Sequence, residues 1–121
     1  MNLEEFNQRL QILLDQDIIT NESRDVAVKA FEQFINVTHK TDIDHAEMLF
    51  THLPMALTRM EMGEKVEPPT ADLMREVEEL EHFQLAKEQV TSIEKLWGKP
   101  LPQGEKEYLY MHYTTVLNSN L

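Results

Sequence analysis

The chain has 121 residues and a formal net charge of -11 at neutral pH, and it contains no cysteine. This length suits one domain, so we expect a single domain over residues 1–121. The lack of cysteine excludes disulfides, thiolate metal ligands and a thiol nucleophile. The acidic charge argues against direct nucleic-acid binding, which depends on clustered lysine and arginine, and is either a solubility feature or suited to a basic partner protein.

No segment approaches the ~20 apolar residues needed to span a membrane. The first six residues are acidic and lack the basic flank and apolar run of a signal peptide. We therefore expect a cytoplasmic protein without a membrane partner.

Apolar residues recur at three- and four-residue spacings along the chain, which indicates amphipathic α-helices. The first helix is expected between Leu3 and about Asp15, and Thr20 or Asn21 is expected to cap the second. The apolar stripe of the second helix is Ala27, Ala30, Phe31, Phe34 and Ile35.

The third predicted helix contains a proline, Pro54, and ends near Gly63. Thr41 followed by Asp44 resembles a capping box, so we expect this helix to begin there. Its core stripe is Ala46, Leu49, Leu53, Ala56, Leu57 and Met60.

Thr70 is expected to cap the next helical region, which breaks near Glu81 and His82 and ends at Gly98. Its first part carries Leu73, Val77 and Leu80, and its second part carries Phe83, Ala86, Val90, Ile93 and Trp97. A final helix contains Glu105 and His112, the latter on an apolar stripe with Leu109, Tyr113 and Val116. No alternating strand pattern is present, so the predicted fold is all-α, a compact bundle of about five helices.

Two pairs of polar residues share a seven-residue spacing, which is almost two helical turns. His45, His52 and Arg59 are predicted to lie in one line beside the core stripe of the third helix. Glu105 and His112 repeat the spacing on the final helix. If the two helices pack together, His52, Arg59, Glu105 and His112 form one partly buried site; otherwise the histidines are ordinary core or surface residues.

Other chemistries have weaker signals. A metal site would draw on the closely spaced His39, His45 and His52, on Asp42, and on the Glu79–His82 segment. A carboxylate-bridged bundle needs two Glu-x-x-His motifs, however, and only one is present. There is no nucleophile elbow and no phosphate-binding glycine loop, so we expect no catalytic residues and no cofactor.

The His/Arg and Glu/His pairs lie within two longer motifs. The first is His52–Arg59 (HLPMALTR), followed by Gly63, and the second is Glu105–His112 (EKEYLYMH). They resemble the two signature segments of the PTS regulation domain (PRD), the phosphotransferase-responsive module of bacterial transcriptional antiterminators and activators. The resemblance runs from about the second helix to the last. Thr51 stands where antiterminators usually have aspartate, so the chain resembles the activator branch more closely.

This resemblance implies a non-enzymatic helical domain that self-associates as a homodimer and controls sugar-utilisation genes through a transcription-regulator partner. It implies His52 and His112 as phosphoryl acceptors, supported by Arg59 and Glu105, with the phosphocarrier HPr or a sugar-permease IIB component as donor. The family usually carries the domain in tandem beside an RNA- or DNA-binding module, whereas this chain has one copy. A non-phosphorylated helical adaptor and a small carboxylate/histidine metalloprotein are the alternatives.

The residue chemistry is compatible with a phosphoacceptor site. A neutral imidazole nitrogen is a competent nucleophile near neutral pH, and a nearby Arg59 would favour the neutral ring and pair with the phosphate. The product adds up to about two negative charges, enough to bias an assembly by about 1 to 3 kcal/mol.

Overall fold

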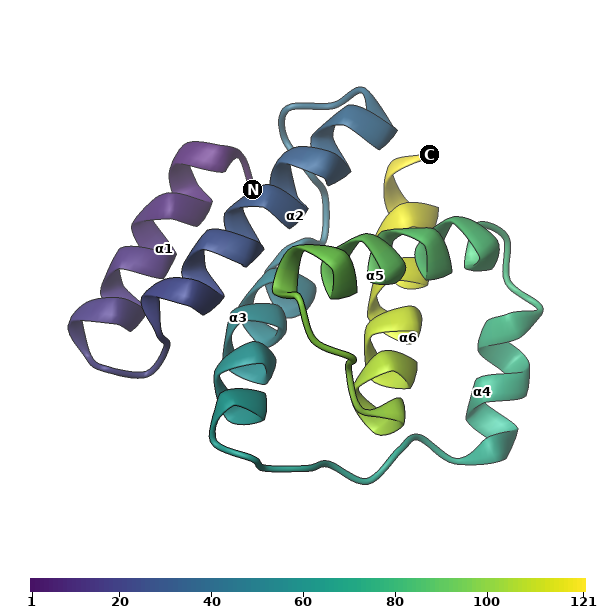
Figure 1. Cartoon of the computed structure of the whole chain (residues 1–121). Helices are drawn as coiled ribbons and strands as arrows, with labels where there is room; N and C mark the ends of the chain where they lie inside the picture. Colours follow the sequence, from purple (N-terminus) through teal and green to yellow (C-terminus); the bar gives the residue numbers. More distant parts are fainter.

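The computed structural model describes all 121 residues as six α-helices without a strand (Figure 1). The all-α fold is therefore confirmed, with six helices instead of about five because the region from 71 to 97 forms two separate helices. The helices are α1 (Leu3–Asp15), α2 (Asn21–Thr38), α3 (Glu47–Glu61), α4 (Ala71–Glu78), α5 (Phe83–Trp97) and α6 (Gln103–Asn120). None of them combines the length and apolar character required to cross a bilayer.

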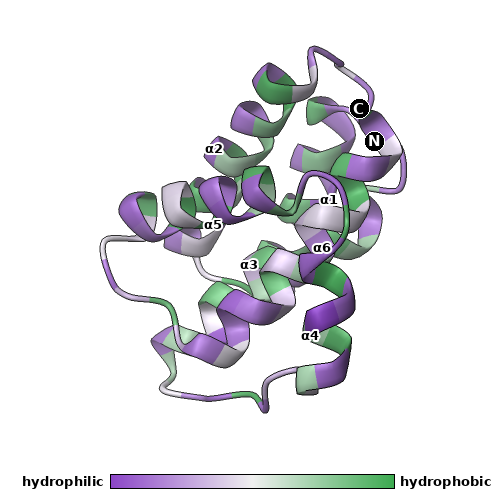
Figure 2. Ribbon diagram, turned by 90° about the vertical axis from the view of Figure 1, so that its right-hand side faces the viewer, coloured by the Kyte–Doolittle hydropathy of each residue, from purple (hydrophilic) through white to green (hydrophobic).

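The packing is built on a ring of contacts: α2 with α3, α3 with α6, α6 with α5, and α5 with α2. α1 and α2 form a hairpin, α2 contacts both α3 and α5, and α6 contacts α3, α4 and α5 (Figure 1). Hydrophobic and hydrophilic residues occupy different faces of the helices (Figure 2). This arrangement leaves α3 and α6 side by side, which is what places the candidate site.

An aromatic cluster forms the centre of the core. Phe50 of α3 lies 4.7 Å from Phe31 and 5.4 Å from Phe6, measured between ring centroids, and 6.3 Å from Tyr113 of α6. These rings are at most 1% exposed. Edge-on aromatic pairs at such distances are favourable beyond the area that they bury, so the cluster fixes α3 relative to α2 and α6.

Several predicted helix ends are confirmed. The side chains of Thr20 and Thr70 accept hydrogen bonds from the N–H groups of Ser23 and Leu73, and so cap α2 and α4. Gly98 ends α5 with a φ of 80°, a left-handed conformation that glycine adopts without strain.

The predicted start of α3 is wrong. Thr41 and Asp44 lie in the connection that precedes the helix, and the helix begins at Glu47 with Ala46 at its N-cap and no side-chain cap. His45 has a φ of 57°, which cannot continue a right-handed helix. His45 is therefore not in line with His52 on α3.

The apolar face of α4 also differs from the prediction. Met74 and Val77 are buried, whereas Leu73 and Leu80 are 38% and 46% exposed. The helix ends at Glu78, because the chain turns before His82, whose φ of 69° separates α4 from α5. Leu80 therefore lies in the turn, so its predicted place on the helix face is wrong, whereas the predicted break near Glu81 and His82 is confirmed.

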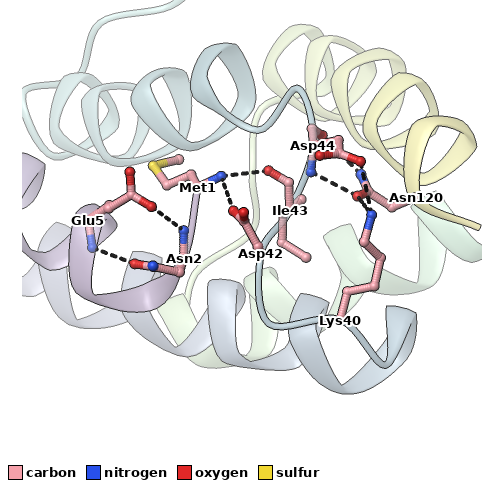
Figure 3. Close-up of polar contacts among 8 residues, drawn as sticks. All are labelled: Met1, Asn2, Glu5, Lys40, Asp42, Ile43, Asp44 and Asn120. Carbon is pink, nitrogen blue, oxygen red and sulfur yellow. Dashed lines mark hydrogen bonds and ion pairs between the residues drawn. The ribbon is translucent and has the colours of Figure 1, made fainter.

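The connection between α2 and α3 is fastened to both ends of the chain (Figure 3). The Met1 amino group donates hydrogen bonds to Asp42 Oδ1 and to the Ile43 carbonyl, each at 2.7 Å. Asn120 accepts a bond from the Asp44 N–H at 2.9 Å and donates to the Asp44 carbonyl at 3.0 Å. These bonds replace the missing side-chain cap in fixing where α3 begins.

Candidate functional site

α3 and α6 carry the four residues that the sequence spacing singles out. His52 and Arg59 lie two turns apart on α3, and Glu105 and His112 lie two turns apart on α6. α3 runs through Pro54 without interruption, so the spacing between His52 and Arg59 stays helical. The packing of α3 on α6 brings all four side chains into one cluster, as the sequence analysis expected.

Glu105 is the centre of this cluster. Its Oε2 atom lies 3.5 Å from His52 Nε2, and its Oε1 atom lies 3.4 Å from Arg59 Nη2. The Glu105 side chain is 2% exposed, compared with 24% for His52 and 31% for Arg59. One buried carboxylate on α6 therefore bridges two basic side chains on α3.

The cluster is also where buried polar atoms lack partners. The protein has three buried side-chain nitrogen or oxygen atoms without a hydrogen bond, and they are His52 Nε2, Arg59 Nε and Glu105 Oε2. Burying an unpaired polar atom costs about 1 to 3 kcal/mol, so such atoms are rare outside functional sites. The long His52–Glu105 separation and the free Arg59 nitrogen leave hydrogen-bonding capacity for a further group.

The two histidine rings face each other across the helix interface. Their centroids are 5.2 Å apart with an angle of 44° between the planes. Leu109, Tyr113 and Val116 are buried whereas His112 is half-buried, so His112 lies at the edge of this stripe, as the interpretation of a partly buried site expects. A half-buried position at the edge of the core keeps the ring accessible.

Tyr108 was not predicted to belong to this region. Its ring centroid lies 6.4 Å from that of His52. The signal was present in the sequence, because Tyr108 follows Glu105 by three residues and precedes His112 by four, spacings that share a helix face.

The environment of Glu105 favours its ionised form. Burial is the largest single influence and raises the pKa of this carboxyl, but His52 and Arg59 together lower it by more. The net effect is a pKa below the ordinary value, so Glu105 is a carboxylate at neutral pH.

The environment of His112 favours its neutral form. Burial lowers the pKa of this imidazole, the neighbouring His52 lowers it further, and Glu105 only partly opposes them. A neutral imidazole retains a lone pair on one ring nitrogen, which is the form that reacts with an electrophile.

The first turn of α6 is held in place from two sides. Glu94 of α5 accepts a hydrogen bond from the Leu101 N–H at 2.9 Å and lies 3.3 Å from Lys106 Nζ. On the other side, a Cβ atom at Gly104 would lie 2.6 Å from the Val66 carbonyl oxygen. Only glycine allows this close approach, and it sets the position of the adjacent Glu105.

A shallow surface pocket lies beside His52. It is lined by His45, Glu47, Met48, Thr51, His52 and Thr115. Met48 is 71% exposed there and supplies apolar surface beside His52. His45, although absent from the predicted helical line, borders this pocket and is thus near the site.

The remaining histidines occupy helix boundaries. His39 ends α2 and His82 precedes α5, each with positive φ, a conformation in which histidine is enriched. No three histidine, aspartate or glutamate side chains are grouped as metal ligands, at Glu79–His82 or elsewhere. The structure therefore offers no support for the metalloprotein alternative.

Fold and site together define an all-α domain in which histidines from two helices meet beside one buried carboxylate and one arginine. The family model of the PRD domain matches residues 25–116, which include both histidine motifs and most of the chain. The chain belongs to the PRD family, whose members are regulatory domains responsive to the phosphotransferase system, not catalytic domains. No curated protein and no solved structure matches it.

Proposed function

We propose that this domain is regulated by reversible phosphorylation of His52 and His112, with HPr or a sugar-permease IIB component as the phosphoryl donor. The observation that carries the proposal is the cluster at the α3–α6 interface, where both rings lie 5.2 Å apart beside Arg59 and Glu105. The membership of the PRD family supports the same conclusion.

Each member of the cluster has a role in this proposal. His112 is kept neutral by burial and by His52, so its ring nitrogen is available to attack phosphorus. Arg59 has a buried Nε–H without a partner, and a guanidinium can bind two phosphate oxygens at once. Glu105 holds His52 and Arg59 in place until the phosphate arrives.

The phosphoryl group acts through its charge. A phosphohistidine adds up to about two negative charges, next to the Glu105 carboxylate and in a chain of net charge -11. On either histidine, the phosphoryl group competes with the Glu105 carboxylate for Arg59, and this competition favours a different arrangement of α3 and α6. A bias of about 1 to 3 kcal/mol is enough to change the occupancy of a two-state assembly about 5- to 150-fold.

We propose that this change is transmitted as protein association, in control of sugar-utilisation genes. The domain forms a homodimer and acts on a transcription-regulator partner. Met48, 71% exposed beside His52, supplies apolar surface that supports association next to the modified residues.

The test is phosphoryl transfer to the purified protein. The chain is incubated with phosphoenolpyruvate, enzyme I and HPr, with a IIB component in a parallel reaction, and its intact mass is measured. We expect added phosphoryl groups that are labile in acid and stable in alkali, as for a phosphorus–nitrogen bond. The double variant His52→Gln/His112→Gln should gain none.

A known PRD protein labelled in the same mixture serves as the positive control. An unchanged mass in both donor reactions would overturn the proposal and favour the adaptor alternative. Label that survives in the double variant would mean that the acceptor lies elsewhere.

A further inference from the structure

The two ring nitrogens of His52 differ in their surroundings. Nε2 is buried without a hydrogen bond and faces Glu105 Oε2 at 3.5 Å. Nδ1 makes no hydrogen bond within the protein and is not among the fully buried unpaired atoms, so it keeps some contact with solvent, and the side chain as a whole is 24% exposed. Of the two nitrogens, Nε2 is therefore the one shielded from a reactant in solvent.

The carboxylate also decides which nitrogen carries the proton. A neutral imidazole has one N–H and one lone pair, and the hydrogen bond made by one nitrogen sets the state of the other. An ionised carboxylate only accepts hydrogen bonds, and Glu105 is ionised at neutral pH. A small closing movement pairs Nε2–H with Oε2 and satisfies two otherwise unpaired atoms. The lone pair of neutral His52 is then on Nδ1.

The space around the His52 ring also favours Nδ1 as the atom that reacts. A phosphoryl group on Nε2 would displace the Glu105 carboxylate, which is 2% exposed and held by Arg59 as well as His52. By contrast, His52 contributes to the open pocket that Met48 and Thr51 also line. A donor seated over this pocket approaches the exposed part of the ring without moving Glu105.

We infer that His52 accepts the phosphoryl group on Nδ1, and that Glu105 is the positioning residue that directs it there by holding the proton on Nε2. The inference rests on the proposed function, since it names the acceptor atom of the same reaction.

The step balances as a direct transfer between two proteins. The phosphorus–nitrogen bond of the donor's phosphohistidine, or the phosphorus–sulfur bond of a phosphocysteine, breaks and leaves its electron pair on the donor. The lone pair of His52 Nδ1 forms the new phosphorus–nitrogen bond. The proton remains on Nε2, and the positive charge of the substituted ring is compensated by Glu105.

The experiment uses the whole chain with 15N-labelled histidine. Before transfer, long-range proton–nitrogen NMR spectra show which nitrogen of His52 carries the proton. Immediately after transfer from phosphorylated HPr, the same spectra, with standards of both phosphohistidine isomers, show which nitrogen carries phosphorus. We expect the proton on Nε2 and a roughly tenfold or larger excess of the Nδ1 isomer at His52.

Glu105→Gln tests the positioning role, because the amide is similar in size but can either accept from Nε2–H or donate to a bare Nε2. We expect this variant to give a mixture of isomers at His52. The matched control is Glu107→Gln, which removes a carboxylate from the same helix and should keep the wild-type excess. Far-ultraviolet circular dichroism checks that both variants retain their helices.

The outcomes separate the inference from the proposed function. Phosphorylation of His52 mainly on Nε2, or a proton on Nδ1 before transfer, overturns the inference and leaves the proposed function standing. An unchanged isomer ratio in Glu105→Gln removes Glu105 from its positioning role. Absence of phosphorylation at His52 and His112 overturns the proposed function, and the inference with it.

Discussion

The two histidines of the site share a spacing pattern but not an environment. His52 is oriented by the buried carboxylate of Glu105 and has one nitrogen shielded from solvent. His112 is approached by the His52 ring at 5.2 Å, and no carboxylate holds it in the same way. The difference shows that a helical spacing can bring residues together without making them equivalent. Glu105 therefore orients the His52 ring and favours one of its nitrogens as the reactive atom. His112 is neutral, and no carboxylate fixes which of its two nitrogens carries the proton.

The largest difference between the two environments should appear in stability. Glu105→Ala removes the acceptor of the Arg59 hydrogen bond and the carboxylate beside His52 Nε2, and it leaves space where a buried side chain was, so we expect a loss of about 1 to 3 kcal/mol in the free energy of unfolding. His112→Ala removes a half-buried ring without such a partner and should cost less, about 1 kcal/mol. Urea denaturation followed by circular dichroism measures both values.

Glu107→Ala is the control for loss of a glutamate on α6, and we expect it to change stability by no more than about 0.5 kcal/mol. If Glu105→Ala is as mild as this control, the bridge between α3 and α6 does not contribute to folding, and the contrast between the two histidines loses its basis.

A second, smaller effect is the loss of folding stability at acidic pH. The pKa of His112 in the folded protein is below its ordinary value of 6.5. As the pH falls, the unfolded chain therefore takes up this proton before the folded protein does. The stability that is present above pH 6.5 is lost as the pH falls through the pKa of the folded protein. Glu105 acts in the same direction, since its folded pKa is below 4.5 and its contribution is lost at lower pH. We therefore expect stability to fall in two steps on acidification.

Urea denaturation at a series of pH values resolves the two steps. His112→Gln should flatten the part of the curve that begins as the pH falls through about 6.5, the ordinary pKa of histidine, and Glu105→Gln should flatten only the part below about pH 4.5. A curve for His112→Gln that is parallel to that of the wild type in the upper range would contradict the lowered pKa of His112.

The smallest expected effect on stability is that of Arg59→Ala. Arg59 is 31% exposed and off the buried stripe of α3, and His52 still lies beside the buried Glu105 carboxylate after Arg59 is removed, so its loss should cost no more than about 1 kcal/mol. Its loss should nevertheless weaken the effect of phosphorylation on dimerisation, because the phosphate loses a bidentate partner. Arg59→Lys should restore only part of the effect of phosphorylation on dimerisation, since lysine keeps the charge but lacks the planar guanidinium that binds two oxygens.

Sedimentation velocity on phosphorylated and unphosphorylated protein measures this effect, with Arg75→Ala as a control for loss of an exposed arginine that pairs with Asp72 on α4. Unfolding of Arg59→Ala would make Arg59 a structural residue. If dimerisation depends neither on phosphorylation nor on Arg59, the switch acts through a different partner.

The helical fold and the composition of the site could be predicted from local patterns. Apolar periodicity located the helices, and the seven-residue spacing placed His52 with Arg59 and Glu105 with His112 on shared faces. The convergence of these faces needed only that α3 and α6 be neighbours. The start of α3 was missed because a plausible capping pattern at Thr41 competed with long-range bonds from Met1 and Asn120, which no local pattern encodes.

The asymmetry between the histidines could not be predicted in the same way. It depends on the axial register of α6 against α3, which is set by the close approach of Gly104 to the backbone at Val66 and by the contacts of Glu94 with the start of α6. A shift of one turn would place the Glu105 carboxylate opposite a different residue of α3. Packing between distant segments, and not helix propensity, decides which nitrogen of His52 is shielded.

The most direct test of the account is to locate the phosphoryl groups among the five histidines of the phosphorylated protein by fragment-ion mass spectrometry at alkaline pH. His39, His45 and His82 serve as internal controls, because they lie outside the Glu105 cluster and have left-handed backbone conformations beside helix ends. The account predicts phosphate on His52 and His112 and none on the other three. Phosphate on His39, His45 or His82, with His52 and His112 unmodified, would contradict it.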